Sequence, residues 1–425
     1  MKLLKRLLSI ALTITCLATA PLWSGQTMLP EVAISELDNA QYMPKSAHNS
    51  QRDEYLVVWH NSGGGSRDIY GKRLDGSGNA LASFTITTGG VDLAQPTVAY
   101  DDINDQYLVV WIRDTFGDGS DWDLWGRLIP WDGPDGTLQE FSIDVKSSDQ
   151  YSPTVAFALT QREFFVVWNN DDGSSPVDVE GRRILLDGTF PPNSSVPIAS
   201  GASHLANPDV AYNLARNEYL VTYDLNGADI MATRLTGEGV ILGGGEFGIA
   251  AWPDPESRPA VAACRGGIDQ YFVVWQSLVG ANNNDVYGRF VTGGGAVDGA
   301  PIHFDFTVID EQRPDVICHT GLSEYLVVWE QQYSSTSGPF GIRGQRLKTS
   351  RVNSTSFQIR GVFVGQTGLA FEPAAASGGQ GFLVSWEHER QGTSYKDIHG
   401  RLVTDGFFED GFESGDTLEW STTVP

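Results

Sequence analysis

The chain is poor in cysteine, histidine and basic residues. Its 425 residues include three Cys, seven His and 28 Lys+Arg against 53 Asp+Glu, which gives a formal net charge of −25. This acidity argues against nucleic acid and anionic membranes as partners. The histidines are scattered with no pair at metal-ligand spacing, and neither Gly-x-Ser-x-Gly nor His-Glu-x-x-His occurs. The sequence therefore predicts no catalytic motif and no resident cofactor.

Long apolar segments are also lacking. The run from Leu7 to Ala20 follows Lys2, Lys5 and Arg6 and is too short for a stable membrane span. A positive start, a short apolar core and small residues at its end are typical of a secretory signal peptide, which we place at residues 1–25. Cys16 raises a lipoprotein alternative, although the residues before it match a lipidation site poorly. We expect a secreted or periplasmic protein without membrane insertion.

One five-residue pattern dominates what is present. The stretch Tyr107–Trp111 reads Tyr-Leu-Val-Val-Trp, and six related stretches follow or precede it. They are Tyr55–Trp59, Phe164–Trp168, Tyr219–Tyr223, Tyr271–Trp275, Tyr325–Trp329 and Phe382–Trp386. Their last residues are 52, 57, 55, 52, 54 and 57 positions apart, a spacing typical of repeat architectures. Because each copy is apolar at consecutive positions, we expect a strand that is buried on both faces.

Three further strands are predicted in each repeat except the last, in which two are predicted. A Pro-x-Val-Ala segment such as Pro96–Ala99 precedes the apolar strand, and its proline is expected at the strand's first position. A segment like the one at 68–74 (Asp-Ile-Tyr-Gly-Lys-Arg-Leu) forms a third strand. Short fourth strands are predicted at Phe84–Ile86, Phe141–Ile143, Val196–Ile198, Phe247–Ile249, Phe306–Val308 and Phe357–Ile359. Four antiparallel strands in a repeat of this length indicate a β-propeller blade.

These repeats predict an all-β fold, a seven-bladed β-propeller over residues 28–404, followed by an acidic C-terminal tail at 405–425. The last repeat lacks a fourth strand, and Glu31–Ile34 precedes Pro44 much as Phe141–Ile143 precedes Pro153. We therefore expect residues 30–36 to pair with the third strand of the last blade, near Asp397–Val403. This pairing would close the ring and remove its exposed edges.

The repeats resemble the [Tyr/Phe]-Leu-Val-Val-Trp repeats of exported bacterial propellers. The tail segment Gly411–Asp416, Gly-Phe-Glu-Ser-Gly-Asp, resembles a short tail at the ends of many exported bacterial proteins, which implies a Gram-negative source. Better-known propeller signatures are missing: the Trp-Asp dipeptide ending each blade, the kelch Gly-Gly pair and the sialidase Ser-x-Asp-x-Gly-x-Thr-Trp box. No catalytic residue carries over from those families.

Two cysteines remain once a signal peptide is removed. Cys264 and Cys318 each lie seven residues before the apolar strand of their repeat, so they occupy equivalent positions on neighbouring innermost strands. An exported compartment permits a disulfide, for which the Cα atoms must lie within about 7 Å. Two separate buried thiols are the alternative.

The connections between second and third strands vary most, and they should share one face of the propeller with the fourth-to-first connections. Candidate ligand-binding residues on that face are Asp114, Asp118, Asp121, Trp122, Trp252 and Tyr333. The acids of the 112–122 loop make a calcium site possible, although their spacing departs from a regular calcium loop. Aromatic side chains on loops can stack on sugars or anchor a protein partner. The alternatives are structural roles: the acids would form a solvated loop, and the aromatic side chains would cover the blade cores.

Three functions remain open at this point. We favour a monomeric, exported binding or interaction propeller whose ligand, an extracellular protein or glycan, sits on the variable face. The alternative is a hydrolase or lyase acting on extracellular polysaccharide, for which two carboxylates from different blades would have to converge about 5–9 Å apart in the central pocket. A purely structural surface protein is the third possibility.

Overall fold

The protein is described here by a computed structural model. It describes residues 26–405 except 64, 135–137, 174–175, 202, 281–282, 306–308, 334–338, 362–368, 380, 391–392 and 394. The predicted signal peptide and nearly all of the predicted tail therefore lie outside the described residues. Residues Thr27–Thr404 form one compact unit. Within the described part of the chain, no helix is long and apolar enough to cross a membrane.

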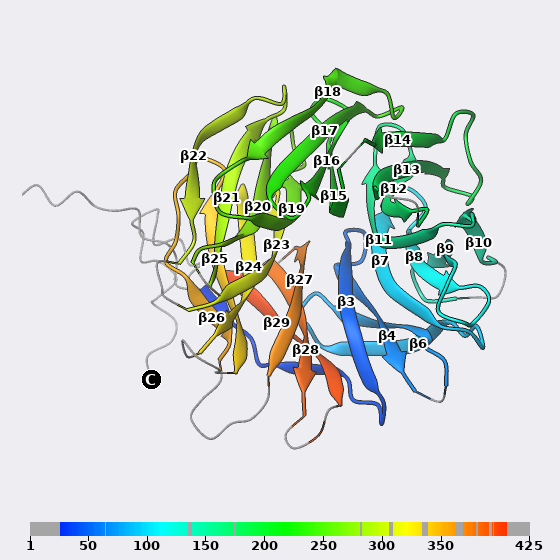
Figure 1. Cartoon of the computed structure of the whole chain (residues 1–425). Coiled ribbons are helices and arrows are strands. Elements are labelled where there is room, and N and C mark those ends of the chain that lie inside the picture. The colour runs from blue at the N-terminus through cyan, green and yellow to red at the C-terminus, as the bar shows by residue number, and fades with distance from the viewer. Residues whose placement is uncertain are drawn as a thin grey trace, which may run out of the picture. The chain divides into compact units, whose positions relative to one another are not determined.

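Seven antiparallel sheets are arranged around a central axis, and the predicted seven-bladed β-propeller is confirmed (Figure 1). We number the blades in chain order and the strands of a blade from the innermost outward. Blades 1 to 3 contain β3 (Ala40–Asn49), β4 (Glu54–Ser62), β5 (Ile69–Asp75) and β6 (Ala80–Thr87); β7 (Leu93–Asp101), β8 (Gln106–Asp114), β9 (Trp122–Pro130) and β10 (Phe141–Asp144); β11 (Asp149–Ala158), β12 (Glu163–Asp171), β13 (Asp178–Leu185) and β14 (Ser195–Ala199).

Blades 4 to 6 follow the same order. They contain β15 (Leu205–Asn213), β16 (Glu218–Leu225), β17 (Asp229–Thr236) and β18 (Ile241–Ala250); β19 (Glu256–Ala263), β20 (Gln270–Leu278), β21 (Asn284–Thr292) and β22 (Val297–His303); β23 (Glu311–His319), β24 (Glu324–Gln332), β25 (Phe340–Lys348) and β26 (Phe357–Arg360). One predicted fourth strand, Phe306–Val308, lies outside the described residues. The fourth strand of blade 5 is β22, which lies before it.

Blade 7 joins the two ends of the described chain. Its inner strands are β27 (Ala370–Gly378), β28 (Gly381–Glu389) and β29 (Lys396–Asp405), and its outer position is shared by β1 (Gln26–Met28) and β2 (Val32–Ser35). Val32 pairs with Gly400 and Ala33 with His399, so the predicted closure by residues 30–36 is confirmed. The innermost strands β27 and β3 also contact each other, which completes the ring.

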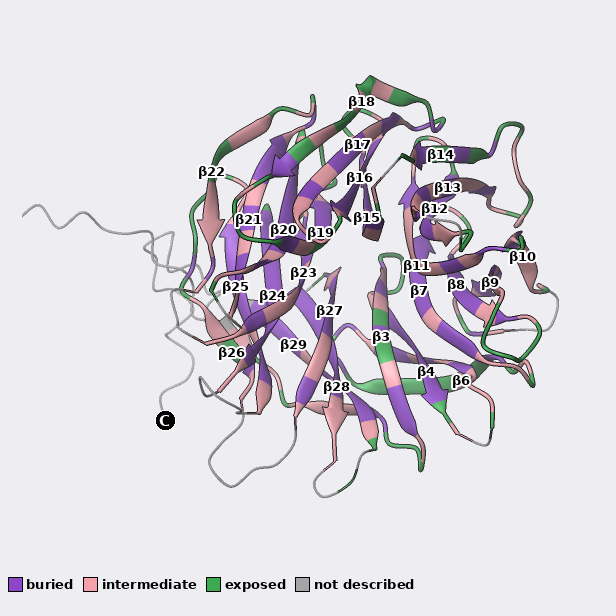
Figure 2. Cartoon of the chain, viewed as in Figure 1, coloured by how far each residue is buried: buried purple, intermediate pink, exposed green. Residues whose placement is uncertain are grey.

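The second strand of each blade is buried because it packs against both neighbouring blades (Figure 2). In blade 2, Tyr107, Val109 and Trp111 belong to a core cluster with blade 1. Leu108 and Val110, which alternate with them, belong to a cluster with blade 3. Successive side chains of a strand point to opposite faces, so a strand with a core on each side is apolar at every position. The expected double burial is confirmed.

Candidate ligand-binding site at the mouth of the central channel

Every innermost strand contains a kink at its proline. The residue before each proline has a positive φ of 47–52°, and the pairing with the second strand shifts register across it. These residues are Met43, Gln95, Ser152, Asn207, Arg258, Arg313 and Glu372. The expectation that the proline opens the strand is wrong, since each strand begins three or four residues before its proline. Proline is accommodated here because the bulge removes the need for its missing N–H.

The seven kinks surround the axis and line a cavity of about 370 Å³. The prolines repeat in all seven blades, but the residues on either side of them vary between blades. Arg258 and Arg313 contribute positive charge, Glu372 contributes negative charge, and Gln95 and Asn207 contribute amides. A repeated backbone thus displays a varied set of side chains. Residues that serve the blade repeat with it, whereas residues that serve a ligand need not.

Four of the seven kinks are hydrogen-bonded to the preceding blade, each through the residue that follows the aromatic end of that blade's second strand. Glu387 accepts a hydrogen bond from the N–H of Met43 (2.9 Å), and Glu330 accepts one from the N–H of Glu372 (2.6 Å). Gln276 and Asp224 play the same part for the N–H groups of Arg313 and Arg258. Burial raises the pKa of Glu330 to about 7 against the opposing charge of Arg313. It also raises the pKa of Glu387 against that of Lys396.

Two carboxylates from non-adjacent blades line the channel. Asp209 of blade 4 accepts hydrogen bonds from Thr154 Oγ1 (2.9 Å) and from the N–H of Val261 (2.8 Å). Asp315 of blade 6 accepts one from the N–H of Ala375 (2.8 Å). Burial raises the pKa of Asp209 to about 6, and the charge of Asp315 adds to the rise. Burial likewise raises the pKa of Asp315 against the attraction of Lys45.

A larger cavity of about 730 Å³ lies where blades 7 and 1 meet. It shares Met43 and Glu372 with the channel, so the two spaces adjoin. Its walls come from the 62–67 connection, the starts of β3 and β27, the end of β28 and the start of β29. All of these belong to the variable-loop face, which carries the second-to-third and fourth-to-first connections. We call this cavity the groove.

The charged groups of the groove are paired with one another. Arg67 binds Asp92 (2.9 Å), and Lys396 binds the buried Glu387 (2.5 Å). Glu372 binds Arg313 of the channel (2.9 Å). Tyr42 and His60 stack at the same site with ring centroids 5.6 Å apart. Arg313 also binds the buried Glu330 (2.8 Å). The groove therefore offers many hydrogen-bond donors and acceptors, and each of these charged groups lies beside a group of opposite charge.

The structure places the acids of the 112–123 loop in the loop's own hydrogen bonds. Asp114 is buried and accepts bonds from the N–H groups of Gly117 and Gly119, both 2.8 Å. Asp118 accepts bonds from the N–H (3.0 Å) and Oγ (2.7 Å) of Ser120. Asp121 adopts a positive φ of 63°. Among the described residues, the groups with three or more converging metal-ligand atoms include none of these acids, and calcium at this loop stays a prediction.

Trp122 is the candidate residue of that loop that lines a cavity. A space of about 230 Å³ is walled by Trp122 and Tyr151, and it shares Arg67 with the groove and Gln95 with the channel. The guanidinium of Arg67 lies 5.2 Å from the centre of the Trp122 ring. Trp122 is thus connected to the groove through Arg67.

Trp252 and Tyr333 lie away from these cavities. Trp252 packs edge-on against Trp275 and Tyr287, with ring centroids 5.7 and 4.9 Å away, and covers the core of blade 5. Tyr333 lies at the end of blade 6's second strand, where a Cβ on Gly341 would meet its ring at 2.6 Å. Neither residue joins the 112–123 loop in one site.

Cys264 and Cys318 are joined by a disulfide with the Cα atoms 5.1 Å apart. Cys264 directly follows β19 and Cys318 lies in β23, so the bond links blades 5 and 6 near the inner strands. Both cysteines are buried in one core cluster with Tyr325 and Phe272. The bond is remote in sequence from the residues that line the groove.

No protein-family model and no curated protein sequence matches the chain. Solved structures resemble it in fold. A protein of unknown function from Dyadobacter fermentans aligns with a TM-score of 0.53 at 9% identity, over 90% of this chain and 99% of that one. A GH93 α-L-arabinofuranosidase of Fusarium graminearum, solved with arabinobiose, aligns with a TM-score of 0.49 at 11% identity, over 89% and 98%. These likenesses concern the fold alone.

Proposed function

We propose that the chain is a binding propeller whose ligand is a neutral, hydroxyl-rich molecule, a glycan, held in the groove and at the mouth of the channel. The observation that carries this proposal is the pairing of the groove's charges. The ion pairs are Arg67 with Asp92, Lys396 with Glu387, and Arg313 with both Glu372 and Glu330. They present fixed donors and acceptors, each beside a group of opposite charge. Such a surface suits hydroxyl groups better than an ion.

The size of the site supports a small ligand or the end of a chain. Ligand pockets typically enclose about 300–1,000 Å³, and the groove and the channel cavity measure about 730 and 370 Å³. A formal net charge of −25 disfavours polyanions such as nucleic acid. A protein partner would engage a convex feature instead, such as the 112–123 loop, whose Phe116 is 70% exposed.

We also propose that the protein is exported from a Gram-negative cell and acts as a monomer. The signal-like segment at 1–25 and the tail motif at 411–416 are the sequence support for export. The disulfide between Cys264 and Cys318 adds structural support, because such bonds persist in oxidising compartments.

A glycan screen on the purified protein tests the proposal, with and without added calcium. For any glycan that binds, Arg67→Gln should weaken binding at least about tenfold, because it removes groove donors and leaves Asp92 unpaired. The matched control is Arg216→Gln. Arg216 pairs with Asp269 (2.7 Å) at similar exposure, but on the hairpin turns of the opposite face. Equal losses in the two variants, or capture of proteins but no glycan, would refute the proposal.

A second candidate function is cleavage of a polysaccharide in the channel, by hydrolysis or by the elimination reaction of a lyase. Asp209 and Asp315 favour it, because they come from different blades, line one cavity and have raised pKa values, as a general acid requires. Release of reducing or unsaturated ends from a bound glycan would support it, provided Asp209→Asn and Asp315→Asn abolish release and preserve binding. Binding without turnover would leave the propeller a binder.

A further inference from the structure

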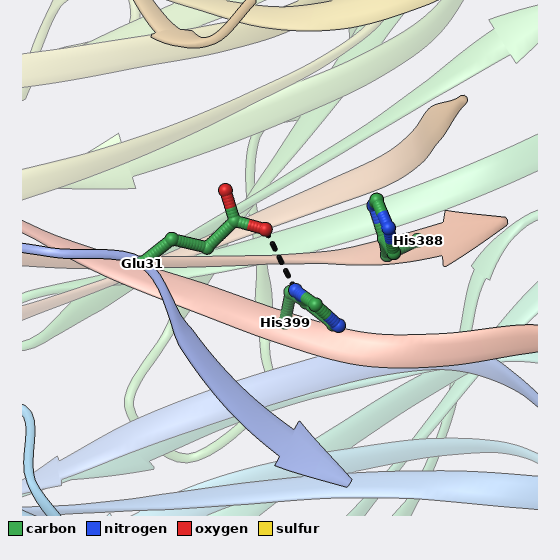
Figure 3. Close-up of side chains that lie close together, drawn as sticks. All are labelled: Glu31, His388 and His399. Carbon is green, nitrogen blue, oxygen red and sulfur yellow. Dashed lines mark hydrogen bonds and ion pairs between the residues drawn. The ribbon is translucent and has the colours of Figure 1, made fainter. Parts of the chain in front are cut away.

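The structure brings together two histidines and a glutamate that the sequence keeps apart. His388 lies on β28, His399 on β29, and Glu31 directly before β2 (Figure 3). One ligand atom from each of the three lies within 4.8 Å of the others. The absence of histidine pairs at metal-ligand spacing was misleading here, because the β28–β29 hairpin sets positions 388 and 399 on adjacent strands.

We propose that Glu31, His388 and His399 form a transition-metal site, with Zn²⁺ as its natural occupant, at the seam where the N-terminal strand closes the propeller. Two imidazoles and one carboxylate are a ligand set typical of zinc, with a water molecule as the fourth ligand. Nitrogen-rich sites favour such metals over calcium, which prefers oxygen.

Hydrogen bonding leaves both histidines able to take a metal. Nδ1 of His388 is buried without a hydrogen-bond partner in the structure, and Nδ1 of His399 faces Glu31 Oε1. The ring centroids of the two histidines lie 4.2 Å apart.

Glu31 divides its two oxygens between the site and a pair of arginines. Oε1 lies 2.7 Å from Nδ1 of His399, and a metal bound there would replace the proton they share. Oε2 lies 3.3 Å from Arg360 Nε and 3.8 Å from Arg401 Nη2. The arginines orient the carboxylate, as supporting groups do around metal ligands, while their charge moderates the affinity for a cation.

The ligand atoms would have to adjust on binding. Zinc–nitrogen bonds are about 2.0–2.1 Å long, so tetrahedral ligands lie roughly 3.3 Å apart. Glu31 Oε1 and His399 Nδ1, 2.7 Å apart, would separate slightly, and the other distances, none above 4.8 Å, would shorten through side-chain rotation. A bound metal would then connect β28 and β29 to a residue 368 positions away along the chain. The metal would therefore hold the N-terminal segment against blade 7 and stabilise the closed ring.

A second group, Glu36, Asp397 and His399, shares one histidine with the first. It is the weaker candidate, because Arg390 already holds both oxygens of Asp397. Glu36 is also exposed, and this group contains a single imidazole. Glu36→Gln is therefore a matched control for Glu31→Gln.

The test is Zn²⁺ titration of the purified full chain against a chromophoric chelator. We expect one tight Zn²⁺ per chain, weakened at least about tenfold by Glu31→Gln or His388→Ala. Binding should be unchanged in Glu36→Gln and in His204→Ala, which removes an exposed histidine of blade 4. If His388→Ala does not fold, His388→Phe keeps the ring volume. No stoichiometric binding, wild-type affinity in the Glu31 and His388 variants, or loss in Glu36→Gln would overturn the proposal.

Stability gives a second measurement. Zn²⁺ should raise the melting temperature of the wild type by several degrees, and a chelator should reverse the rise. Hydrogen exchange of residues 31–35 should slow in the metal-bound wild type. A metal that binds but leaves this exchange unchanged would contradict the proposal that it stabilises ring closure.

Discussion

At the scale of single residues, the seams between blades depend on acids that follow the aromatic end of the second strand. Glu330 is 0% exposed and accepts hydrogen bonds from the N–H of Glu372 and from Arg313. An acid buried this far is stable only because both oxygens are occupied. These contacts place Glu372 and Arg313 at the channel wall, so a seam residue also shapes the candidate site.

Replacing Glu330 tests this role. Glu330→Ala leaves the N–H of Glu372 without an acceptor and removes one of the two carboxylates that bind Arg313. We expect a loss of about 3 kcal/mol, at the low end for a broken buried pair. The value is discounted because Arg313 is 30% exposed. Glu330→Gln keeps one acceptor and should lose less. Urea unfolding at pH 7 measures both, and equal stability of the two variants would contradict the argument.

The pH dependence of stability should report on Asp209. Its pKa in the folded chain is about 6, above the ordinary 3.8, so the folded state holds a proton that the unfolded state releases. Its contribution to the free energy of unfolding therefore falls as pH rises from about 4 to about 6 and stays low above that. Asp209→Asn should not show this decrease in the free energy of unfolding, because asparagine does not titrate.

Denaturant unfolding of both proteins from pH 4 to pH 7.5 gives the measurement. The variant should gain stability relative to the wild type as pH rises. A difference that does not change with pH would mean that Asp209 has no raised pKa.

At the scale of elements, the short strand β2 decides whether the ring is closed. Ile34 is 1% exposed and belongs to a core cluster that contains Tyr55 and Trp59 of blade 1 and Leu402 of blade 7. The four residues of β2 thus contribute to the core between blades 1 and 7. Without them, β29 would expose an unpaired edge.

A chain beginning at residue 40 should therefore aggregate or lose a large part of its stability. Thermal unfolding and light scattering provide the measurement. A chain ending at residue 405 is the control and should melt like the full chain. If the N-terminal truncation also melts like the full chain, ring closure does not depend on β2.

The disulfide is a second device at this scale, since it links two blades. It closes a loop of 54 residues, for which chain entropy gives about 4 kcal/mol of stabilisation. Cys264→Ser with Cys318→Ser should lower stability by an amount of that order. Thiol labelling of the unfolded protein should gain two reactive thiols only after reduction, and labelling of both before reduction would exclude the bond.

At the scale of the whole molecule, function should be confined to the variable-loop face. Trp122→Ala should weaken ligand binding, because Trp122 reaches the groove through Arg67. This change should leave the melting temperature nearly unaltered. Asp114→Asn is different and should lower it, because Asp114 holds two N–H groups of its loop.

Substitutions in the Asp101–Asp105 turn of the opposite face are the comparison for binding. Titration of the bound glycan measures both sets. If the turn variants lose affinity and the Trp122 variant keeps it, the ligand lies on the other face.

The candidate site could be predicted only in part. The variable face was visible in the sequence because its connections differ in length, and the residues beside the seven prolines also differ between repeats. What the sequence concealed was the kink at each proline. A positive φ before proline is unusual, and the local pattern favours an extended strand. The groove between blades 7 and 1 was hidden as well, since its walls come from both ends of the chain.

The sequence by itself determined the fold: seven copies of a doubly apolar strand, with turns between them, can bury their faces only by stacking around a ring. It also determined the closure, because one strand was missing at one end and present at the other. Tertiary structure alone decided which side chains meet. Glu31 reaches His399 across 368 residues, and Asp209 and Asp315 share a channel although they belong to different blades. Such contacts depend on the register of strands and the angle between blades, which a repeat's local pattern does not encode.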